Sequence, residues 1–470
     1  MSGFGGSGFG GGNRNNNRNN NNNSWGGKGG RNNNSWGGHG GGRNSGRGGR
    51  HSGRGGRSGG RGGRSGGRGP SGLIKICGFY TKRDDCSRVS CQHAHVIKLH
   101  AKIDATGKIN NNNNNNNGFS KGGDCHAVTS VAIWETGGNV KIFTGGKDGF
   151  WRLWSFNART NQFDQEFEHQ MGGPVETLVV ASNYLFCGFD GISKALPEIS
   201  VGMVHAWNLA SPNDPPLEFH MQPNLIPYAH PSAVKKLLVI GQKVISGSVD
   251  GSIKLWTFQP PSAEHPKGAF VLTQNLLGHA REISGLVDVG SMLWSCSTDG
   301  SIRLWDMAKP GAPCQHFISM SSPASGGNDN SGPGHTNAVT GLEKFKSSAG
   351  DFVLSCSLDG TVKAWNGGTG QCVASESHED GVVSMSMIGD MNGKPCLLLG
   401  CESGMMYIRN LEPTAKIQQA FAGLIILHEF VAVVHYGAVK SLCKGPAGTF
   451  YTGGEDGKVL VYQITGDLGL

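Results

Sequence analysis

The sequence is poor in apolar residues for its length, since 36% of its 470 residues are hydrophobic. It lacks an apolar run long enough to span a bilayer, because FAGLIILHEFVAVV, which starts at Phe421, is interrupted by His428 and Glu429. No apolar segment follows Met1, so we expect no secretory signal. No Gly-rich phosphate loop or nucleophile motif is present. These absences argue against a membrane protein and against an enzyme, and we expect the nucleus or the cytoplasm as its location.

Acidic residues are absent from residues 1–70, which contain 12 Lys and Arg residues. Residues 71–120 carry a net charge of +4, and because the whole chain is +8, residues 121–470 sum to −8. Residues 1–70 are also of low complexity, with repeated Gly, Asn and Arg, so they cannot bury enough apolar surface to form a core. We predict a disordered, basic N-terminal arm, whose charge favours a polyanion such as nucleic acid as a partner.

Eight arginines between Arg43 and Arg68 are separated by Gly and Ser. Flexible arginines can pair with phosphates and stack on unpaired bases without a fixed fold. The segment resembles the Arg-Gly-Gly boxes of RNA-binding proteins, and we take Arg47, Arg54 and Arg61 as representative RNA contacts. The alternative is a solubilising tail without a specific partner.

A pattern of strands and turns recurs in the second part of the chain. Its best example runs from His279 to Asp306, HAREISGLVDVGSMLWSCSTDGSIRLWD, in which alternating apolar residues flank an Asp-Gly turn. Five units place a Trp or Tyr six positions after the Asp and a His 20 to 24 positions before it. The five sets are His126, Asp148 and Trp154; His230, Asp250 and Trp256; His279, Asp299 and Trp305; His335, Asp359 and Trp365; and His435, Asp456 and Tyr462.

Two further units are degenerate. One ends at Trp207, and the other starts at His378 with Ser403 and Arg409 in the Asp and aromatic positions. Seven units at this spacing resemble the WD-repeat β-propeller, which implies an all-β, seven-bladed propeller over residues 121–466 with four strands per blade. The resemblance also implies that His, Asp, Trp and a strand Ser or Thr form a buried hydrogen-bond network in each blade. Because the set repeats, we interpret it as architecture and not as a catalytic site.

The last unit stops after KVLVYQIT and contains only three strands. In this family a strand from before the first blade closes the ring, and residues 96–103 or 118–124 are the candidates. We favour 96–103, because Gly122 and Gly123 make a poor strand. Residues 104–120, with an Asn run over 110–117, are predicted to be a linker or a loop on the first blade.

Three of the 12 cysteines cluster before the repeats, and the other nine are scattered, which indicates a reducing compartment and no disulfide framework. The cluster has the spacing C-x8-C-x4-C-x3-H and consists of Cys77, Cys86, Cys91 and His95. Three thiolates and one imidazole complete a tetrahedral zinc shell without an open position, so we predict one structural Zn²⁺ in residues 74–100. Chance clustering of cysteines is the alternative.

The spacing resembles the CCCH zinc finger. In the members that bind RNA, aromatic rings three after the first Cys and two after the third stack on bases, and here these positions hold Tyr80 and His93. His93 departs from the usual Phe or Tyr, so stacking there is expected to be weaker. Lys82, Arg83 and Arg88 supply positive charge for phosphates. A finger that contacts only protein is the alternative.

The order of arm, finger and propeller resembles zinc-finger CCCH proteins with WD repeats, a family known mainly from plants and related eukaryotes. This resemblance implies an RNA-associated nuclear or cytoplasmic factor. Our hypothesis is a scaffold, monomeric outside complexes, in which finger and arm contact single-stranded RNA and the propeller faces recruit protein. A rival is the substrate receptor of a cullin-type ubiquitin ligase, although Ala308 replaces the Arg of the Trp-Asp-x-Arg motif after Trp305 and Asp306. A protein-only scaffold is a third hypothesis.

Overall fold

The structure is a computed structural model. It describes residues 73–75, 97–106, 126–192, 198–222, 225–263, 265–309, 311–319, 334–347, 350–389, 393–411 and 429–465. All of these lie in the compact unit that spans Gly66–Leu470. The predicted arm over residues 1–70 and most of the predicted linker over 104–120 lie outside the described residues. No helix in the described ranges is both long and apolar enough to cross a membrane.

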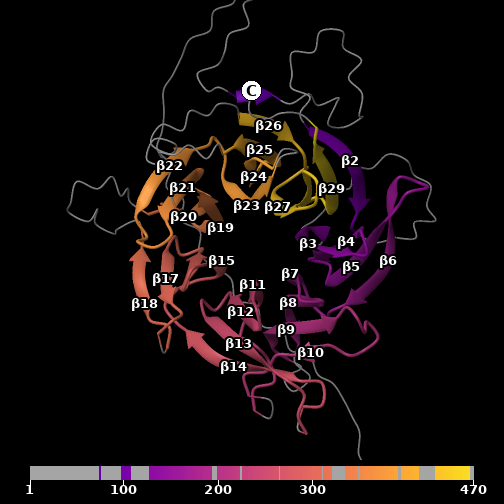
Figure 1. Cartoon of the computed structure of the whole chain (residues 1–470), viewed down its shortest axis with the longest axis vertical. Coiled ribbons are helices and arrows are strands. Elements are labelled where there is room, and N and C mark those ends of the chain that lie inside the picture. The colour runs from indigo at the N-terminus through magenta and orange to yellow at the C-terminus, as the bar shows by residue number, and fades with distance from the viewer. Residues whose placement is uncertain are drawn as a thin grey trace, which may run out of the picture. The chain divides into compact units, whose positions relative to one another are not determined.

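The described strands form seven antiparallel sheets arranged as blades around a centre (Figure 1). Blade 1 contains β3 (Val128–Thr136), β4 (Asn139–Gly146), β5 (Phe150–Asn157) and β6 (Gln162–Gln170). Blade 2 contains β7 (Val175–Ala181), β8 (Tyr184–Ile192), β9 (Ser200–Asn208) and β10 (Leu217–Glu218). Blade 3 contains β11 (Val234–Ile240), β12 (Lys243–Ser248), β13 (Ile253–Gln259) and β14 (Ala269–Leu276).

Blade 4 contains β15 (Ile283–Val289), β16 (Met292–Ser297), β17 (Ile302–Asp306) and β18 (Cys314–Ile318). Blade 5 contains β19 (Val339–Ser347), β20 (Gly350–Ser357), β21 (Thr361–Asn366) and β22 (Cys372–Ser377). Blade 6 contains β23 (Val382–Gly389), β24 (Pro395–Cys401), β25 (Met405–Asn410) and β26 (Glu429–Val433), and blade 7 contains β27 (Val439–Lys444), β28 (Thr449–Gly454) and β29 (Lys458–Ile464). The predicted all-β, seven-bladed fold is confirmed.

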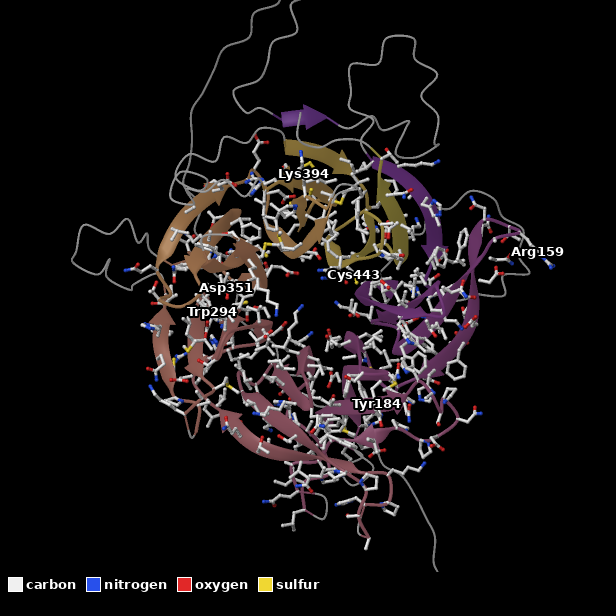
Figure 2. All side chains as sticks on the ribbon, viewed as in Figure 1. Arg159, Tyr184, Trp294, Asp351, Lys394 and Cys443 are labelled. Carbon is white, nitrogen blue, oxygen red and sulfur yellow. The ribbon has the colours of Figure 1, made fainter. Side chains whose placement is uncertain are left out.

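The second strand of each blade is the most buried, because neighbouring blades cover both of its faces. In β16 the five residues from Leu293 to Ser297 are all buried, whereas four of the five residues of the outer strand β18 are exposed. Trp294 on β16, labelled in Figure 2, is completely buried and belongs to one core cluster with Val353 and Trp365 of blade 5. The core therefore lies between the blades, as a set of clusters around the ring.

The strand that completes blade 7 comes from before the first blade. β2 (Ile97–Asp104) pairs antiparallel with β29, in a register from Ile97 opposite Ile464 to Asp104 opposite Lys458. The preference for residues 96–103 as the closing segment is confirmed. The propeller therefore includes residues that the sequence analysis assigned to the end of the finger, over 74–100, and to the start of the linker.

Blade 6 carries a fifth strand that the sequence analysis did not predict. β1 (Leu73–Lys75) pairs in parallel with the outer strand β26, with Leu73 opposite Glu429 and Lys75 opposite Val431. The segment before the predicted zinc ligands thus belongs to the outer edge of blade 6 (Figure 1).

Hydroxyl groups on the inner strands join consecutive blades. Thr340 Oγ1 donates to the Val382 carbonyl oxygen at 2.7 Å, and Ser384 Oγ donates to the Val439 carbonyl oxygen at 2.7 Å. Blade 2 contacts blade 3 through an ion pair between Glu176 and Lys235 at 2.8 Å. These polar contacts around the centre fix the position of each blade relative to the next.

Close packing between blades also limits the size of the side chain that fits at one position of the second strand. A Cβ atom at Gly247 would lie 2.5 Å from Ile283 Cγ2 of the next blade, so only glycine fits there. Blade 4 has Cys296 at the same position, and its partner on the first strand is Gly285. A Cβ atom at Gly285 would lie 2.7 Å from Cys296 Sγ. The side chains at these two paired positions, one on the first strand and one on the second, therefore compete for the same space, so a larger residue at one requires a smaller residue at the other.

Candidate functional site

The predicted zinc ligands Cys77, Cys86, Cys91 and His95 lie outside the described residues. The same is true of all the predicted RNA contacts, which are Tyr80, Lys82, Arg83, Arg88, His93, Arg47, Arg54 and Arg61. Within the part of the chain that the structure describes, no group of three or more His, Cys, Asp or Glu side chains could hold a metal ion. The zinc site and the RNA contacts stay predictions.

The structure does describe the strands on either side of the predicted finger. β1 ends at Lys75 and lies on blade 6, whereas β2 begins at Ile97 and lies on blade 7. Blades 6 and 7 are consecutive in the ring, because β23 of blade 6 packs against β27 of blade 7. The segment with the four predicted ligands therefore starts and ends at the outer strands of two neighbouring blades.

The repeated His, Asp and Trp residues form the predicted buried network, and blade 3 illustrates its geometry. Trp256 Nε1 donates to Ser246 Oγ at 2.9 Å, and the same hydroxyl lies 2.7 Å from His230 Nε2. His230 Nδ1 lies 3.0 Å from Ser252 Oγ and 3.4 Å from Asp250 Oδ2. The amide of Ser252 donates to Asp250 at 2.7 Å. The network ties the third strand to the second strand and to the loop that precedes the first.

The same contacts recur in blades 4 and 5. In blade 5, His335 lies 3.2 Å from Asp359 and 2.7 Å from Ser355, which accepts a hydrogen bond from Trp365 at 2.8 Å. Blade 4 reproduces this arrangement with His279, Asp299, Ser295 and Trp305. In blade 7, His435 contacts Asp456 and Thr452, and Tyr462 stands in the Trp position. The prediction of a repeated network is confirmed for these blades.

The charges of the network follow from burial and hydrogen bonding. Burial lowers the pKa of His230 to about 4, so the imidazole is neutral at pH 7. Burial alone would raise the pKa of Asp250, but hydrogen bonds from His230 and Ser252 lower it to about 2. The pair of His230 and Asp250 therefore carries one net negative charge. Because Ser246, Ser295 and Ser355 are completely buried, no substrate can reach these hydroxyl groups, which supports the structural interpretation.

Blade 1 departs from the predicted network. Trp154 Nε1 donates to Thr144 at 2.9 Å as expected, but His126 Nδ1 is buried without a hydrogen-bond partner in the described part of the chain. Asp148 instead forms an ion pair with Arg152 at 2.8 Å. The expectation that His126 and Asp148 pair is therefore wrong, because the guanidinium group of Arg152 takes the carboxylate.

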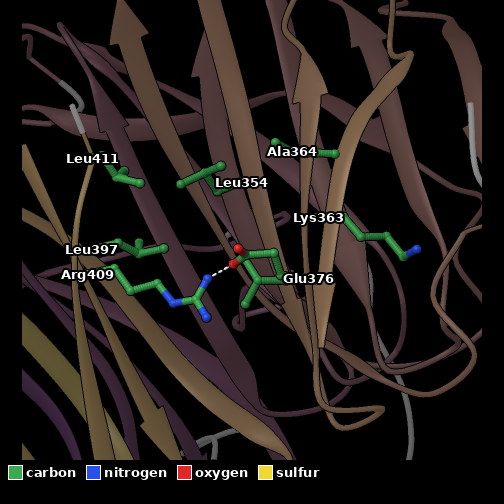
Figure 3. A pocket seen from close by; sticks show the side chains of 9 residues that line it. Leu354, Lys363, Ala364, Glu376, Leu397, Arg409 and Leu411 are labelled. Carbon is green, nitrogen blue, oxygen red and sulfur yellow. Dashed lines mark ion pairs between the residues drawn. The ribbon is translucent and has the colours of Figure 1, made fainter. Parts of the chain in front are cut away.

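The two degenerate units form complete blades without the network. The buried Ser or Thr of the second strand is replaced by Cys187 in blade 2 and by Leu399 in blade 6. In blade 6, Ser403 donates a hydrogen bond to Asp380, and Arg409 occupies the Trp position. Arg409 forms a buried ion pair with Glu376 of blade 5, in a small space between the blades that is lined by Leu354 and Leu411 (Figure 3).

Sequence analysis missed a set of cations on the third strands, of which Arg152 and Lys254 are buried and Arg303 is partly exposed. Arg152 Nη1 donates to the Ala105 carbonyl oxygen at 2.9 Å, Lys254 Nζ donates to the Ala229 carbonyl oxygen at 2.7 Å, and Arg303 Nη2 donates to the Gly278 carbonyl oxygen at 2.8 Å. Each acceptor belongs to the loop that follows a fourth strand. The signal was present in the sequence, as a basic residue two positions before the Trp in WRLW, IKLW and IRLW.

Four segments of the chain match a known family, WD40, described as "WD domain, G-beta repeat". The matched residues are 120–155, 224–257, 270–306 and 326–366. No curated protein matches the chain.

Two solved structures are similar to this chain, and the first of them, with a TM-score above 0.5, supports the fold. The structure described as "Crystal structure of WD40 beta propeller domain of Doa1" has 19% sequence identity and a TM-score of 0.51, and the match covers 73% of this chain and 95% of that one. The computationally designed Ika8 protein has 20% identity and a TM-score of 0.46, over 72% of this chain and 97% of that one. The chain therefore carries WD40 repeats and folds as a seven-bladed β-propeller, an architecture that typically acts as a protein-interaction scaffold.

Proposed function

We propose that the protein is an RNA-binding scaffold. The finger and the Arg-rich arm contact single-stranded RNA, while the propeller recruits a protein partner. The observation that carries the proposal is the set of four donors at Cys77, Cys86, Cys91 and His95, preceded by an arm with 12 basic and no acidic residues. This combination supports a nucleic-acid partner for the N-terminal part and a different partner for the propeller, whose region is acidic overall.

The donor set fits a structural zinc ion. Three thiolates and one imidazole fill a tetrahedral shell, so the bound ion holds a small fold together and leaves no position for a reactive water. Tyr80 then offers a ring for base stacking, and Lys82, Arg83 and Arg88 offer charge for phosphates. Residues 77–95 contain few apolar side chains, so this fold depends on the metal.

The flanking strands support a fixed base for the finger. β1 pairs with β26 through three residue positions, and β2 pairs with β29 along eight residues. A segment whose two ends belong to neighbouring blades samples less space than a free chain of the same length, which lowers the entropy lost when RNA binds. The Arg-rich arm adds a second weak contact on the same chain and raises avidity through effective concentration.

The test is crosslinking and sequencing of bound RNA for the full chain, for Cys86→Ser and for a chain that lacks residues 1–70. Cys314→Ser is the matched control, because Cys314 is an exposed cysteine on β18 of blade 4. We expect one zinc per chain in the wild type and in Cys314→Ser, and a loss of both zinc and specific crosslinks in Cys86→Ser. Crosslinks that persist unchanged in Cys86→Ser would remove the finger as the RNA reader.

A salt titration separates the contributions of arm and finger. Binding of single strands weakens with a slope of about −0.7 per neutralised phosphate, so loss of the arm should flatten the salt dependence. A salt slope that stays the same without residues 1–70 would remove the arm from the RNA contact. Recovery of protein but no RNA with the wild type would support a protein-only scaffold instead.

A further inference from the structure

Exposed apolar side chains gather at one end of blades 2, 3 and 4. The structure describes eleven exposed large apolar side chains, and five of them lie on the turns and loops at this end. They are Ile192, 58% exposed, Ile199, 55%, Leu225, 80%, Val249, 37%, and Leu277, 69%. At the opposite end of these three blades, Ile240 is the exposed large apolar side chain among the described residues. Concentration of such side chains on one face is typical of an interaction surface.

The loops that carry these side chains form one continuous surface, which we call the blade 2–4 face. The Gly202 amide of blade 2 donates to the His230 carbonyl oxygen at 2.8 Å, which joins the turn near Ile199 to the loop that contains Leu225. A Cβ atom at Gly251 would lie 2.5 Å from the His279 carbonyl oxygen, so the turn after Val249 is in close contact with the loop after Leu277. The five side chains therefore belong to adjacent segments of backbone.

The blade 2–4 face also carries excess negative charge. Glu198 is exposed beside Ile199, Asp250 follows Val249, and Glu282 and Asp299 are partly exposed in blade 4. Asp250 is ionised at neutral pH because its pKa is lowered to about 2, and its partner His230 is neutral. Two basic side chains oppose this charge: Arg281 is exposed in the loop from Leu277 to Glu282, and the partly exposed Arg303 donates to the Gly278 carbonyl oxygen beside Leu277. Apolar side chains on this face are thus surrounded mainly by carboxylates.

We propose that the blade 2–4 face binds a protein segment that carries both apolar and basic side chains. The apolar side chains of the partner cover Leu225 and Leu277, and its Lys or Arg residues lie against Glu198 and Asp250. Such a surface gives affinity through buried apolar area and selects its partner by charge. The proposal rests on the scaffold role of the propeller and names the chemistry of its partner, but it does not depend on RNA binding.

Three labelled twelve-residue peptides test the proposal against the full chain by fluorescence anisotropy. The first alternates Leu and Arg, the second alternates Leu and Glu, and the third contains Arg with Gly and Ser but no apolar residue. We expect the Leu–Arg peptide to bind at least tenfold more tightly than each of the others at 150 mM salt. Equal affinity for the Arg–Gly–Ser peptide would show that charge alone is recognised and would overturn the proposal.

Variants locate the binding surface. The double variant Leu225→Ser with Leu277→Ser should weaken the Leu–Arg peptide at least tenfold, whereas Ile240→Ser, at the other end of blade 3, should leave its affinity within twofold. Arg281→Glu should strengthen binding about threefold, because it removes a competing positive charge. All four side chains are on the surface, so these changes leave the core packing in place.

RNA binding of the same variants separates this proposal from the proposed function. Crosslinking through the finger should be unchanged in the Leu225→Ser and Leu277→Ser variant. RNA crosslinks that persist in Cys86→Ser, together with retained peptide binding, would remove the finger as the RNA reader and support the blade 2–4 face alone. Peptide affinity that is equal in the wild type and in the double variant would overturn the blade 2–4 face, whatever the RNA result.

Discussion

Arg152 of blade 1 donates a hydrogen bond from Nη1 to the carbonyl oxygen of Ala105 at 2.9 Å. Ala105 directly follows β2, the strand that closes blade 7, so this contact joins the first blade to the end of the closing strand. The guanidinium group also pairs with Asp148 at 2.8 Å and with Glu168 at 3.3 Å, and the whole side chain is buried. A single residue thus connects the two sides of the ring closure.

We predict that Arg152→Met destabilises the protein by about 2–3 kcal/mol, because it leaves the buried Ala105 carbonyl oxygen without its side-chain donor and Asp148 without its ion-pair partner. Arg152→Lys should recover part of the loss, since Lys254 makes the equivalent contact in blade 3. Denaturant unfolding measures the change, and cleavage near residue 106 by a protease reports opening of the closure. Arg159→Met is the control, because Arg159 is exposed at the outer tip of blade 1 (Figure 2). Equal stability of Arg152→Met and the control would contradict this role.

The hydroxyl group of Ser355 in blade 5 forms hydrogen bonds with two buried side chains. Ser355 Oγ accepts from Trp365 and contacts His335, so Ser355→Ala leaves both side chains without this partner. We expect a loss of about 2–4 kcal/mol in the free energy of unfolding. Ser291→Ala, in an exposed turn of blade 4, should change stability by less than about 0.5 kcal/mol. A cost for Ser355→Ala as small as that of the control would show that the hydrogen bonds contribute little.

The contribution of His230 to stability should fall with acid, whereas Glu343, whose pKa burial raises to about 7, contributes with the opposite sign because the folded state favours its protonated form. His230 has a folded pKa of about 4, below its usual value of 6.5, so the unfolded state binds more protons between these two values. The stabilisation is fully present above pH 6.5 and is lost as the pH falls towards 4. At pH 5 the loss is on the order of 2 kcal/mol relative to pH 7.5. His335, whose pKa is also lowered by burial, adds to it.

Thermal unfolding between pH 7.5 and 5 measures this effect, with His230→Gln as the comparison. The variant should be less stable at pH 7.5 but should lose less stability than the wild type between pH 7.5 and 5. An identical pH profile for wild type and variant would mean that other groups cause the acid sensitivity.

The shared volume of Gly285 and Cys296 predicts a compensating pair of substitutions. Gly285→Ser alone should destabilise by about 1–3 kcal/mol, because its Cβ would lie 2.7 Å from Cys296 Sγ and 2.9 Å from the Leu342 amide nitrogen of the next blade. Cys296→Gly removes only the first of these two contacts. Blade 7 has the reverse combination, Ser441 opposite Gly453, and Ser441 accepts a hydrogen bond from the Val131 amide at 3.1 Å.

We therefore expect Gly285→Ser with Cys296→Gly to be more stable than the sum of the two single changes by at least about 1 kcal/mol. A double-mutant cycle in urea gives the coupling energy. Additive effects within about 0.5 kcal/mol would contradict the shared volume.

The sequence predicted the fold well because each repeat marks the same turn with Asp and the same strand with Trp. His279, Asp299 and Trp305 define blade 4 without reference to any distant residue, and the five regular units then imply the remaining blades. The closing strand was also predictable, since KVLVYQIT leaves one edge of blade 7 unpaired and few segments before the first blade could form a strand.

Contacts between distant segments were not predictable in the same way. β1 has only three residues, and its partner β26 lies more than 350 positions later, so no local pattern indicates the pairing. The ion pair between Asp148 and Arg152 was missed because the repeat pattern predicts that Asp148 pairs with His126. The blade 2–4 face depends on exposed side chains such as Leu225 and Leu277, which stand in irregular loops where periodicity carries no information.

The pairing of β2 with β29 has a consequence for synthesis on the ribosome. Asp104 pairs with Lys458, so β2 waits for a partner strand that is made about 350 residues later. At translation rates of about 5–20 residues per second, the wait is on the order of 20–70 s. During this time residues 97–104 are open to chaperones or to a neighbouring nascent chain, and premature termination late in the message would leave every blade but the last with its full set of strands.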